Sequence, residues 1–366
     1  MEKKSAYFDN AASTRVDPRV VEAMLPYFHQ AYGNPSSLHS AGREARQAVD
    51  EARTIIAHSI GAEPGEIIFT SGGTEANNLA IKGMAFARFR TGKHIIVSAI
   101  EHDCVLNACR WLKSLGFEIG LAPVDKDGII RTDRLEELMR PDTILVSVMH
   151  ANNEIGTIQP VAEIGAICRR HGIPIHSDAS QSFGRIPLGV HEANLDLATI
   201  NSHKIYGPKG VGALFVRKGT LIAPLLHGGG HEQGLRSSTE NVPGIVGFAH
   251  AARLSIAERE SEALRLTALR DRIIDRVLER MPTAYLNGHR RERLPNNVNF
   301  GFKVDDRFIS VTPHGSSTAN VGATFFFDSD PNIGTNNPNQ INVSTFLPDV
   351  DFLSSAADAA IMIVVY

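Results

Sequence analysis

One stretch of the sequence, Asn201-Ser-His-Lys-Ile-Tyr-Gly-Pro-Lys-Gly-Val-Gly212, places a lysine just after an apolar run at residues 197–200. The apolar run is typical of a buried strand, and the Gly/Pro-rich residues behind it indicate a turn. A lysine at a strand end is partly desolvated, so its amine can lose its proton and attack a carbonyl carbon. We therefore take Lys204 as a candidate Schiff-base lysine; the alternative is a solvated lysine in a surface loop.

The sequence around this stretch alternates between amphipathic helices and short apolar runs. Helical patterns cover residues 43–60, 75–89, 104–115, 132–139 and 161–171. Apolar runs lie at residues 67–69, 94–97, 144–149, 174–176, 197–200 and 212–216. This alternation predicts an α/β fold with a mostly parallel central sheet and helices on both faces.

The pattern changes after Pro243, where a long, charge-rich helical stretch covers residues 244–281 and turn signals follow it. We predict a large domain over residues 15–243. A smaller α+β domain is predicted over residues 244–366, and residues 1–14 are expected to belong to it as well. Residues 308–366 are atypical because they contain no Lys, Arg or Cys. At the chain's own frequency of basic residues, roughly six would be expected there. We interpret this stretch as a frameshifted, replaced or highly diverged terminus; the alternative is a fast-evolving C-terminal domain.

The composition favours small metabolites as partners. A net charge of -3 over 366 residues gives no electrostatic argument for nucleic acid or an anionic membrane. Three cysteines, at positions 104, 109 and 168, form no disulfide framework and no CxxC pair. The N-terminus lacks the apolar run of a signal peptide, and no apolar stretch of about 18 residues exists. We expect a cytoplasmic protein.

Three further strand ends carry residues suited to a flat, phosphorylated cofactor. Asp178 follows the run at residues 174–176, where a carboxylate could pair with a pyridinium nitrogen; an ordinary helix N-cap is the alternative. Ser71-Gly-Gly-Thr-Glu-Ala-Asn77 opens a helix, where glycine N–H groups and Thr74 suit a phosphate, or where threonine caps a tight turn.

Two groups of histidines are considered: one follows the third of these strand ends, and the other is rejected as a metal site. His102 follows the run at residues 94–97 and could stack on a cofactor ring and shuttle protons, although a lone histidine is more often structural. His227-Gly-Gly-Gly-His231 forms no helical face and has no Cys or carboxylate cluster beside it, so we predict no metal site. Ligands of parallel sheets bind beyond the carboxyl ends of the strands. The four strand-end motifs therefore predict one common site.

The chain resembles the cysteine desulfurases, which belong to class V of the aminotransferase-like fold, from about residue 7 to residue 302. The motifs that carry the resemblance are Tyr7-Phe-Asp-Asn-Ala-Ala-Ser-Thr14, Tyr32-Gly-Asn-Pro-Ser-Ser-Leu-His39, Phe69-Thr-Ser-Gly-Gly-Thr-Glu75, His150-Ala-Asn-Asn-Glu-Ile-Gly-Thr157, Ser202-His-Lys-Ile-Tyr-Gly-Pro-Lys-Gly210, Gly228-Gly-Gly-His-Glu232 and Arg236-Ser-Ser-Thr239. The resemblance implies fold type I of the PLP-dependent transferases and pyridoxal 5'-phosphate (PLP) as cofactor.

The resemblance also implies residue roles. Lys204 would form the Schiff base and move the substrate Cα proton, while His102 would stack on the ring. Asp178 would hold the pyridine nitrogen, with Gln181 and Asn153 near the ring hydroxyl. The phosphate would be surrounded by Gly73, Thr74, Asn201, Ser202 and His203, with Thr239 reaching the phosphate of the other subunit of a homodimer. Asn201 departs from the small residue that is usual in the family.

A second departure concerns the sulfur-accepting step. In the family a mobile loop, typically Gly-Ser-Ala-Cys, delivers a cysteine that becomes a persulfide, and a later arginine clamps the substrate carboxylate. The nearest stretch here, His314-Gly-Ser-Ser-Thr-Ala-Asn320, would put Thr318 in place of that cysteine, and Asn342 stands where the arginine is expected. A hydroxyl cannot take up sulfur as a thiolate does.

Three functions follow from the resemblance. The first is a desulfurase that converts L-cysteine to L-alanine and passes sulfur to an acceptor protein, for example in iron–sulfur cluster assembly. The second is a related PLP lyase that acts on selenocysteine or cysteine sulfinate and needs no protein thiol. The third is a catalytically silent PLP-binding partner in sulfur transfer.

Overall fold

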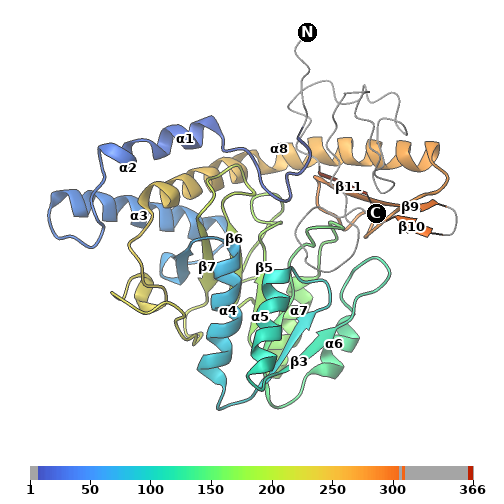
Figure 1. Cartoon of the computed structure of the whole chain (residues 1–366), viewed down its shortest axis with the longest axis horizontal. Helices are drawn as coiled ribbons and strands as arrows, with labels where there is room; N and C mark the ends of the chain where they lie inside the picture. Colours follow the sequence, from blue (N-terminus) through green and yellow to red (C-terminus); the bar gives the residue numbers. More distant parts are fainter. Residues whose placement is uncertain (1–6, 305–306, 310–361, 366) are drawn as a thin grey trace, which may run out of the picture.

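The computed structural model of the protein describes residues 7–304, 307–309 and 362–365, and Figure 1 shows their arrangement. Thr318 and Asn342, the residues expected in place of the loop cysteine and the arginine, lie outside the described residues. So does most of the atypical stretch at residues 308–366.

The six apolar runs of the sequence, together with one strand that was not predicted (β3), form a central sheet of seven strands in the order β1-β7-β6-β5-β4-β2-β3. The strands are β1 (Ile67–Thr70), β2 (His94–Ser98), β3 (Glu118–Ala122), β4 (Thr143–Ser147), β5 (Ile175–Asp178), β6 (Leu197–Asn201) and β7 (Gly212–Val216). Neighbouring strands from β3 to β6 are parallel, whereas β7 is antiparallel to both β6 and β1. The prediction of a mostly parallel sheet is confirmed.

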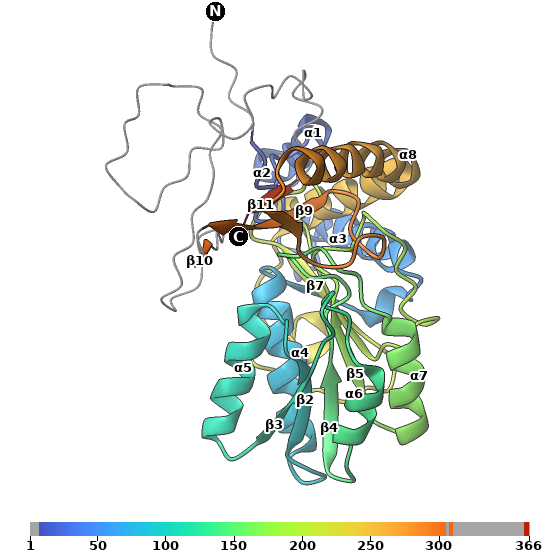
Figure 2. The same ribbon diagram turned by 90° about the vertical axis from the view of Figure 1, so that its right-hand side faces the viewer.

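Helices cover both faces of this sheet, which explains why its inner strands are buried along their whole length. Figure 2 shows α4 (Gly73–Arg88) and α5 (Asp103–Ser114) on one face, and α6 (Thr132–Leu138) and α7 (Val161–His171) on the other. Successive residues of β2 pack into different cores: Ile95 and Val97 belong to the cluster under α4 and α5, and Ile96 to the opposite one. This alternation is what a strand between two helical layers requires.

One helix of 39 residues, α8 (Val242–Arg280), runs along the top of the molecule in Figure 1. Its first half packs with α1 (Pro18–Met24) and α3 (Ser40–Ser59), near the short α2 (Pro26–His29). Its second half buries Leu266, Ile274 and Val277 against Val298 and Phe300 of a second sheet. Because α8 runs without a break from the core of the central sheet to the core of the second sheet, the domain division after residue 243 stays a prediction.

The second sheet is built around β9 (Asn297–Val304). Its other strands are β8 (Ala284–Leu286), β10 (Arg307–Ile309) and β11 (Met362–Val365), of which β11 is parallel to β9 and the other two antiparallel. Two short 3₁₀ helices, Pro64–Glu66 and Glu232–Gly234, complete the described elements.

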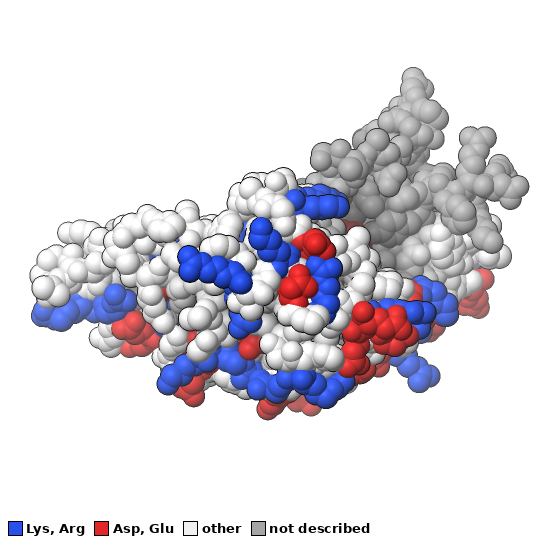
Figure 3. All heavy atoms as spheres, turned by 90° about the horizontal axis from the view of Figure 1, so that it is seen from below, with Lys and Arg blue, Asp and Glu red and all other residues white. Residues whose placement is uncertain are grey.

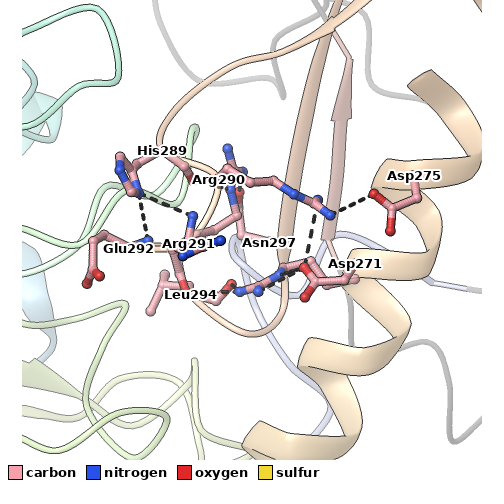
Figure 4. Close-up of polar contacts among 10 residues, drawn as sticks. Asp271, Asp275, His289, Arg290, Arg291, Glu292, Leu294 and Asn297 are labelled. Carbon is pink, nitrogen blue, oxygen red and sulfur yellow. Dashed lines mark hydrogen bonds and ion pairs between the residues drawn. The ribbon is translucent and has the colours of Figure 1, made fainter. Parts of the chain in front are cut away.

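Polar contacts tie the loop before β9 to α8, as Figure 4 shows. Arg290 reaches Asp275 of α8 at 2.8 Å. The His289 ring accepts backbone N–H groups of the two residues after Arg290, and Arg293 Nη1 donates to Asn297 Oδ1 at 2.8 Å. The loop is thereby held against both the long helix and the strand that follows.

The surface matches the near-neutral composition. On the face seen from below in Figure 3, Lys and Arg side chains alternate with Asp and Glu. Within the described part of the chain, no helix combines the length and apolarity needed to cross a membrane.

Candidate active site

The carboxyl ends of the parallel strands meet at one edge of the central sheet and surround a cavity of about 800 Å³. Nine of the eleven predicted site residues line it: Gly73, Thr74, His102, Asn153, Asp178, Gln181, Asn201, His203 and Lys204. Ser202, which lies between Asn201 and His203 in the sequence, is fully buried. Thr239 is exposed and does not line the cavity.

Lys204 borders the cavity in the turn that follows β6. Desolvation lowers the pKa of its amine, an effect that Asp178 opposes and Arg185 reinforces. The turn is fixed by neighbouring groups: Arg185 Nη2 donates to the Lys204 carbonyl at 2.7 Å, and Thr14 Oγ1 donates to the His203 carbonyl at 2.9 Å. A lysine with a lowered pKa in a rigid turn is suited to attack a carbonyl group.

Asp178 is the last residue of β5, and each of its two carboxylate oxygens accepts a hydrogen bond from the protein. Ser180 N donates to Oδ1 at 2.8 Å, and Asn77 Nδ2 donates to Oδ2 at 2.7 Å. The side chain is only 5% exposed, so its orientation is set by these contacts rather than by solvent. A fixed, buried carboxylate can hold a proton on a ring nitrogen.

His102 is the N-cap of α5, and its Nδ1 accepts the backbone N–H of Cys104 at 3.1 Å. Desolvation is the main cause that lowers the pKa of the imidazole, and the positive charge of the nearby Lys204 lowers it further. The ring is therefore neutral at neutral pH, and a neutral flat ring beside the cavity is suited to stacking.

The first turn of α4 and the end of β6 form a polar corner of the cavity. Gly72 caps the helix without a side-chain hydrogen bond, and the helix N-terminus favours an anion. Oδ1 of Asn201 and Oγ of Ser202 are buried with no hydrogen-bond partner. Desolvation and the nearby Lys204 lower the pKa of His203 to about 4. The Ser202 hydroxyl and the amide nitrogen of Asn201, which lies beside Gly73, can donate hydrogen bonds to a phosphate, and the residues present therefore fit PLP.

Gln181 and Asn153 also line the cavity and are held by protein contacts. Gln181 Nε2 donates to the Ala11 carbonyl at 3.0 Å, and its Oε1 accepts from Arg185 at 3.1 Å. Asn153 Nδ2 donates to Glu154 Oε1 at 2.7 Å. Both side chains line the cavity, and their roles toward a ring hydroxyl remain predictions.

The cavity residues that were missed as site residues in the sequence include Asn77, Glu101 and Cys104. Asn77 lies one helical turn after Gly73, so its position on the same face of α4 was a usable signal. Glu101 and Cys104 flank the strand-end His102 in the sequence. The Cys104 thiol lies 3.0 Å from His102 Nδ1.

The segment that carries Thr239 is anchored to the large sheet through Glu232. This buried carboxylate accepts from Phe69 N at 2.7 Å and forms an ion pair with Arg53 at 2.7 Å. The contact of Thr239 with a second subunit stays a prediction.

Known proteins show where this architecture belongs. The aminotransferase class-V family model matches residues 6–307. A protein named cysteine desulfurase IscS from Dictyoglomus turgidum is 54% identical over 300 residues, covering 82% of this chain and 76% of that protein. A protein of the same name from Methanosarcina thermophila is 51% identical over 302 residues, covering 82% and 74%.

Solved structures agree with this assignment. A NifS-like protein has a TM-score of 0.79 at 40% identity and covers 82% of both chains. The structure of SspA in complex with cysteine has a TM-score of 0.74 at 41% identity, covering 82% of this chain and 85% of that one. The chain therefore belongs to the class-V aminotransferases, among the PLP-dependent cysteine desulfurases.

Proposed function

We propose that this protein removes sulfur from L-cysteine, leaves L-alanine and passes the sulfur to a thiol acceptor. The observation that carries the proposal is the placement of Lys204, Asp178 and His102 around one cavity at the strand ends. Bound PLP supplies an electron sink that stabilises negative charge at the substrate Cα. Lys204 would hold the cofactor and move the Cα proton, Asp178 would keep the ring nitrogen protonated, and His102 would stack on the ring.

The remaining roles concern the phosphate, the ring hydroxyl and the second subunit. The corner formed by Gly73, Thr74, Asn201, Ser202 and His203 would bind the phosphate. Gln181 and Asn153 would lie near the ring hydroxyl. Thr239, exposed on an anchored segment, would complete the phosphate site of the other subunit in a homodimer.

The sulfur acceptor would be a thiol outside this chain. The chain has three cysteines, and burial raises the pKa of each thiol to about 12. A thiol that stays protonated is a poor nucleophile for sulfur. An external thiol RSH would attack the substrate sulfur and leave as RSSH, while the substrate carbon skeleton becomes alanine. Iron–sulfur cluster assembly as the pathway and the cytoplasm as the compartment remain predictions.

Cofactor absorbance tests the shared premise. The protein should absorb at about 400–420 nm when PLP is bound. Lys204→Ala should lose this band while keeping its far-ultraviolet circular dichroism, because only the amine that holds the cofactor is removed. A visible band of unchanged height in Lys204→Ala would overturn the assignment of the lysine.

Product assays then separate the reactions. A desulfurase with an external acceptor should form alanine from cysteine continuously, and faster with added dithiothreitol than with cysteine as the sole thiol. Alanine formed in the amount of the enzyme without any added thiol would place the acceptor within this chain.

The buried, protonated thiols also favour a second candidate, a lyase of selenocysteine or cysteine sulfinate, which needs no protein thiolate. Turnover of these substrates, with no alanine from cysteine even with dithiothreitol, would select it. A band that no amino acid alters would instead indicate a catalytically silent PLP-binding protein.

A further inference from the structure

Asn77, on α4, lies between two residues of the cavity. Its Nδ2 is 2.7 Å from Asp178 Oδ2 and 3.0 Å from Cys104 Sγ. A carboxylate oxygen only accepts hydrogen bonds, so the nitrogen end of the amide must face Asp178. The two N–H bonds of this nitrogen are then directed at the carboxylate and at the sulfur. Asn77 is 1% exposed, so solvent does not compete for these contacts.

Cys104 continues the chain of contacts to His102. The backbone N–H of Cys104 donates to His102 Nδ1, which therefore carries no hydrogen in the neutral ring. The thiol lies 3.0 Å from the same Nδ1, so its S–H is the donor in this pair as well. Burial keeps the thiol protonated, with a pKa raised to about 12. The single hydrogen of the neutral imidazole is then on Nε2.

We infer that Asn77 and Cys104 are positioning residues that link Asp178 to His102, fixing the carboxylate orientation of the first and the Nε2–H tautomer of the second. The hydrogen bonds run in one direction: the Asn77 amide donates to both Asp178 and the Cys104 sulfur, and the thiol donates to His102. The value of this link to catalysis rests on the proposed roles of Asp178 and His102 toward the cofactor.

The titration of His102 reports on the link because a donor to Nδ1 stabilises only the neutral ring. The charged groups that face His102 are Lys204, which lowers its pKa, and Asp178 and Asp103, which raise it. Removal of the thiol leaves these groups in place. Cys104→Ala should therefore raise the pKa of His102 by about half a unit, the effect expected from loss of one weak hydrogen bond.

The experiment is ring-nitrogen NMR of the cofactor-free protein with isotopically labelled histidine, in which His102→Gln assigns the signal. In the wild type, Nδ1 should show the shift of an unprotonated, hydrogen-bonded nitrogen. Cys104→Ala should shift the titration upward, and Cys104→Ser, which retains a donor and an acceptor, should restore it. Cys109→Ala is the control, since Cys109 is a buried thiol of the same helix with 2% exposure.

The inference fails if Cys104→Ala moves the His102 titration no further than Cys109→Ala does, or if the wild-type ring carries its hydrogen on Nδ1. Asn77→Ala tests the same link without altering α5. It should shift the same titration in the same direction by a smaller amount, because the sulfur then loses the donor that polarises its S–H. A folded Asn77→Ala protein with the wild-type titration would likewise overturn the link.

A second readout uses the bound cofactor. Asn77→Ala should change the pH at which the visible band titrates, because Asp178 loses one of its two fixed donors, whereas Cys109→Ala should not. An unchanged titration in Asn77→Ala would contradict the positioning of Asp178. Failure of the wild type to bind PLP at all would overturn the proposed function, while the cofactor-free NMR would still decide the hydrogen-bonded link.

Discussion

Glu101 connects two neighbouring strand ends through one oxygen. Its Oε1 accepts from Ser98 Oγ, at the end of β2, at 2.8 Å and from Met149 N, just after β4, at 2.6 Å. Complete burial raises the pKa of this carboxyl to about 8, so it is mostly uncharged at neutral pH. Lys204, Asp178 and His102 were predictable because each follows an apolar run; the role of Glu101 was not, because an acid next to a histidine reveals neither burial nor partners.

The charge state of Glu101 predicts a pH-dependent stability. A carboxyl whose pKa is higher in the folded state stabilises the fold below its unfolded pKa of 4.5 and loses this contribution as pH rises through about 8. Glu101→Gln, which keeps the acceptor but never ionises, should therefore gain stability relative to the wild type as pH rises from about 5.5 to about 8.5. The expected scale is about 1.4 kcal/mol per unit of pKa difference.

Urea unfolding at several pH values measures this difference. The exposed Glu279→Gln is the matched control and should show a constant difference from the wild type. If the difference between Glu101→Gln and the wild type stayed constant over this range, as in the control, the carboxyl would already be ionised in the folded protein.

At the scale of elements, the apolar runs predicted the buried strands and the amphipathic patterns predicted their helices, with α7 at residues 161–171 and β7 at residues 212–216 matching at both ends. The edge strand β3 escaped prediction because only one of its five residues is buried, and its sequence, Glu-Ile-Gly-Leu-Ala, is broken by a charged residue and a glycine. The contact between β9 and the site also escaped: Asn297 Nδ2 and Asn299 Nδ2 both donate to the Glu154 carbonyl, at 3.0 and 3.1 Å. Such pairing joins residues far apart in the sequence.

Gly156 makes this contact between elements testable. Its φ is +72°, and a Cβ added there would lie 2.3 Å from Asn297 Oδ1. Gly172, at the end of α7, has a φ of +66° but nothing within 4 Å of an added Cβ. Both Ala substitutions should cost about 1–2 kcal/mol for the left-handed backbone. Gly156→Ala should lose about 1–3 kcal/mol more in urea unfolding because Asn297 must move; equal losses would show that β9 does not pack closely here.

At the scale of the whole molecule, the alternating pattern predicted a sheet between two helical layers and one site at its carboxyl edge. The direction of β7 was not predicted, since an apolar run of five residues does not encode whether a strand is parallel or antiparallel. Nor did the sequence reveal that α8 contributes residues to two hydrophobic cores, because amphipathicity shows an apolar face but not what covers it. These features depend on connections and packing between distant segments.

Burial of neutral histidines makes the whole molecule sensitive to acid. Desolvation lowers the pKa of His150 to about 4; the pKa of His203 is lowered to about 4, and that of His176 is lowered as well. A histidine with a lowered folded pKa stabilises the fold above its unfolded value of 6.5 and loses that contribution as pH falls toward 4. The raised pKa of Glu101 makes its contribution to the free energy of unfolding increase as pH falls over part of this range, but this single carboxyl opposes three histidines.

We therefore expect the free energy of unfolding to fall by several kcal/mol between about pH 7 and about pH 5. His150→Asn, which can still bond to the Ser182 hydroxyl that lies 2.8 Å from His150 Nδ1, should flatten this fall even if its stability at neutral pH is lower. The informative quantity is the slope with pH, because a packing defect alone shifts the curve without changing its slope. A slope in His150→Asn as steep as that of the wild type would mean that His150 is already protonated in the folded protein, or that it titrates alike in both states.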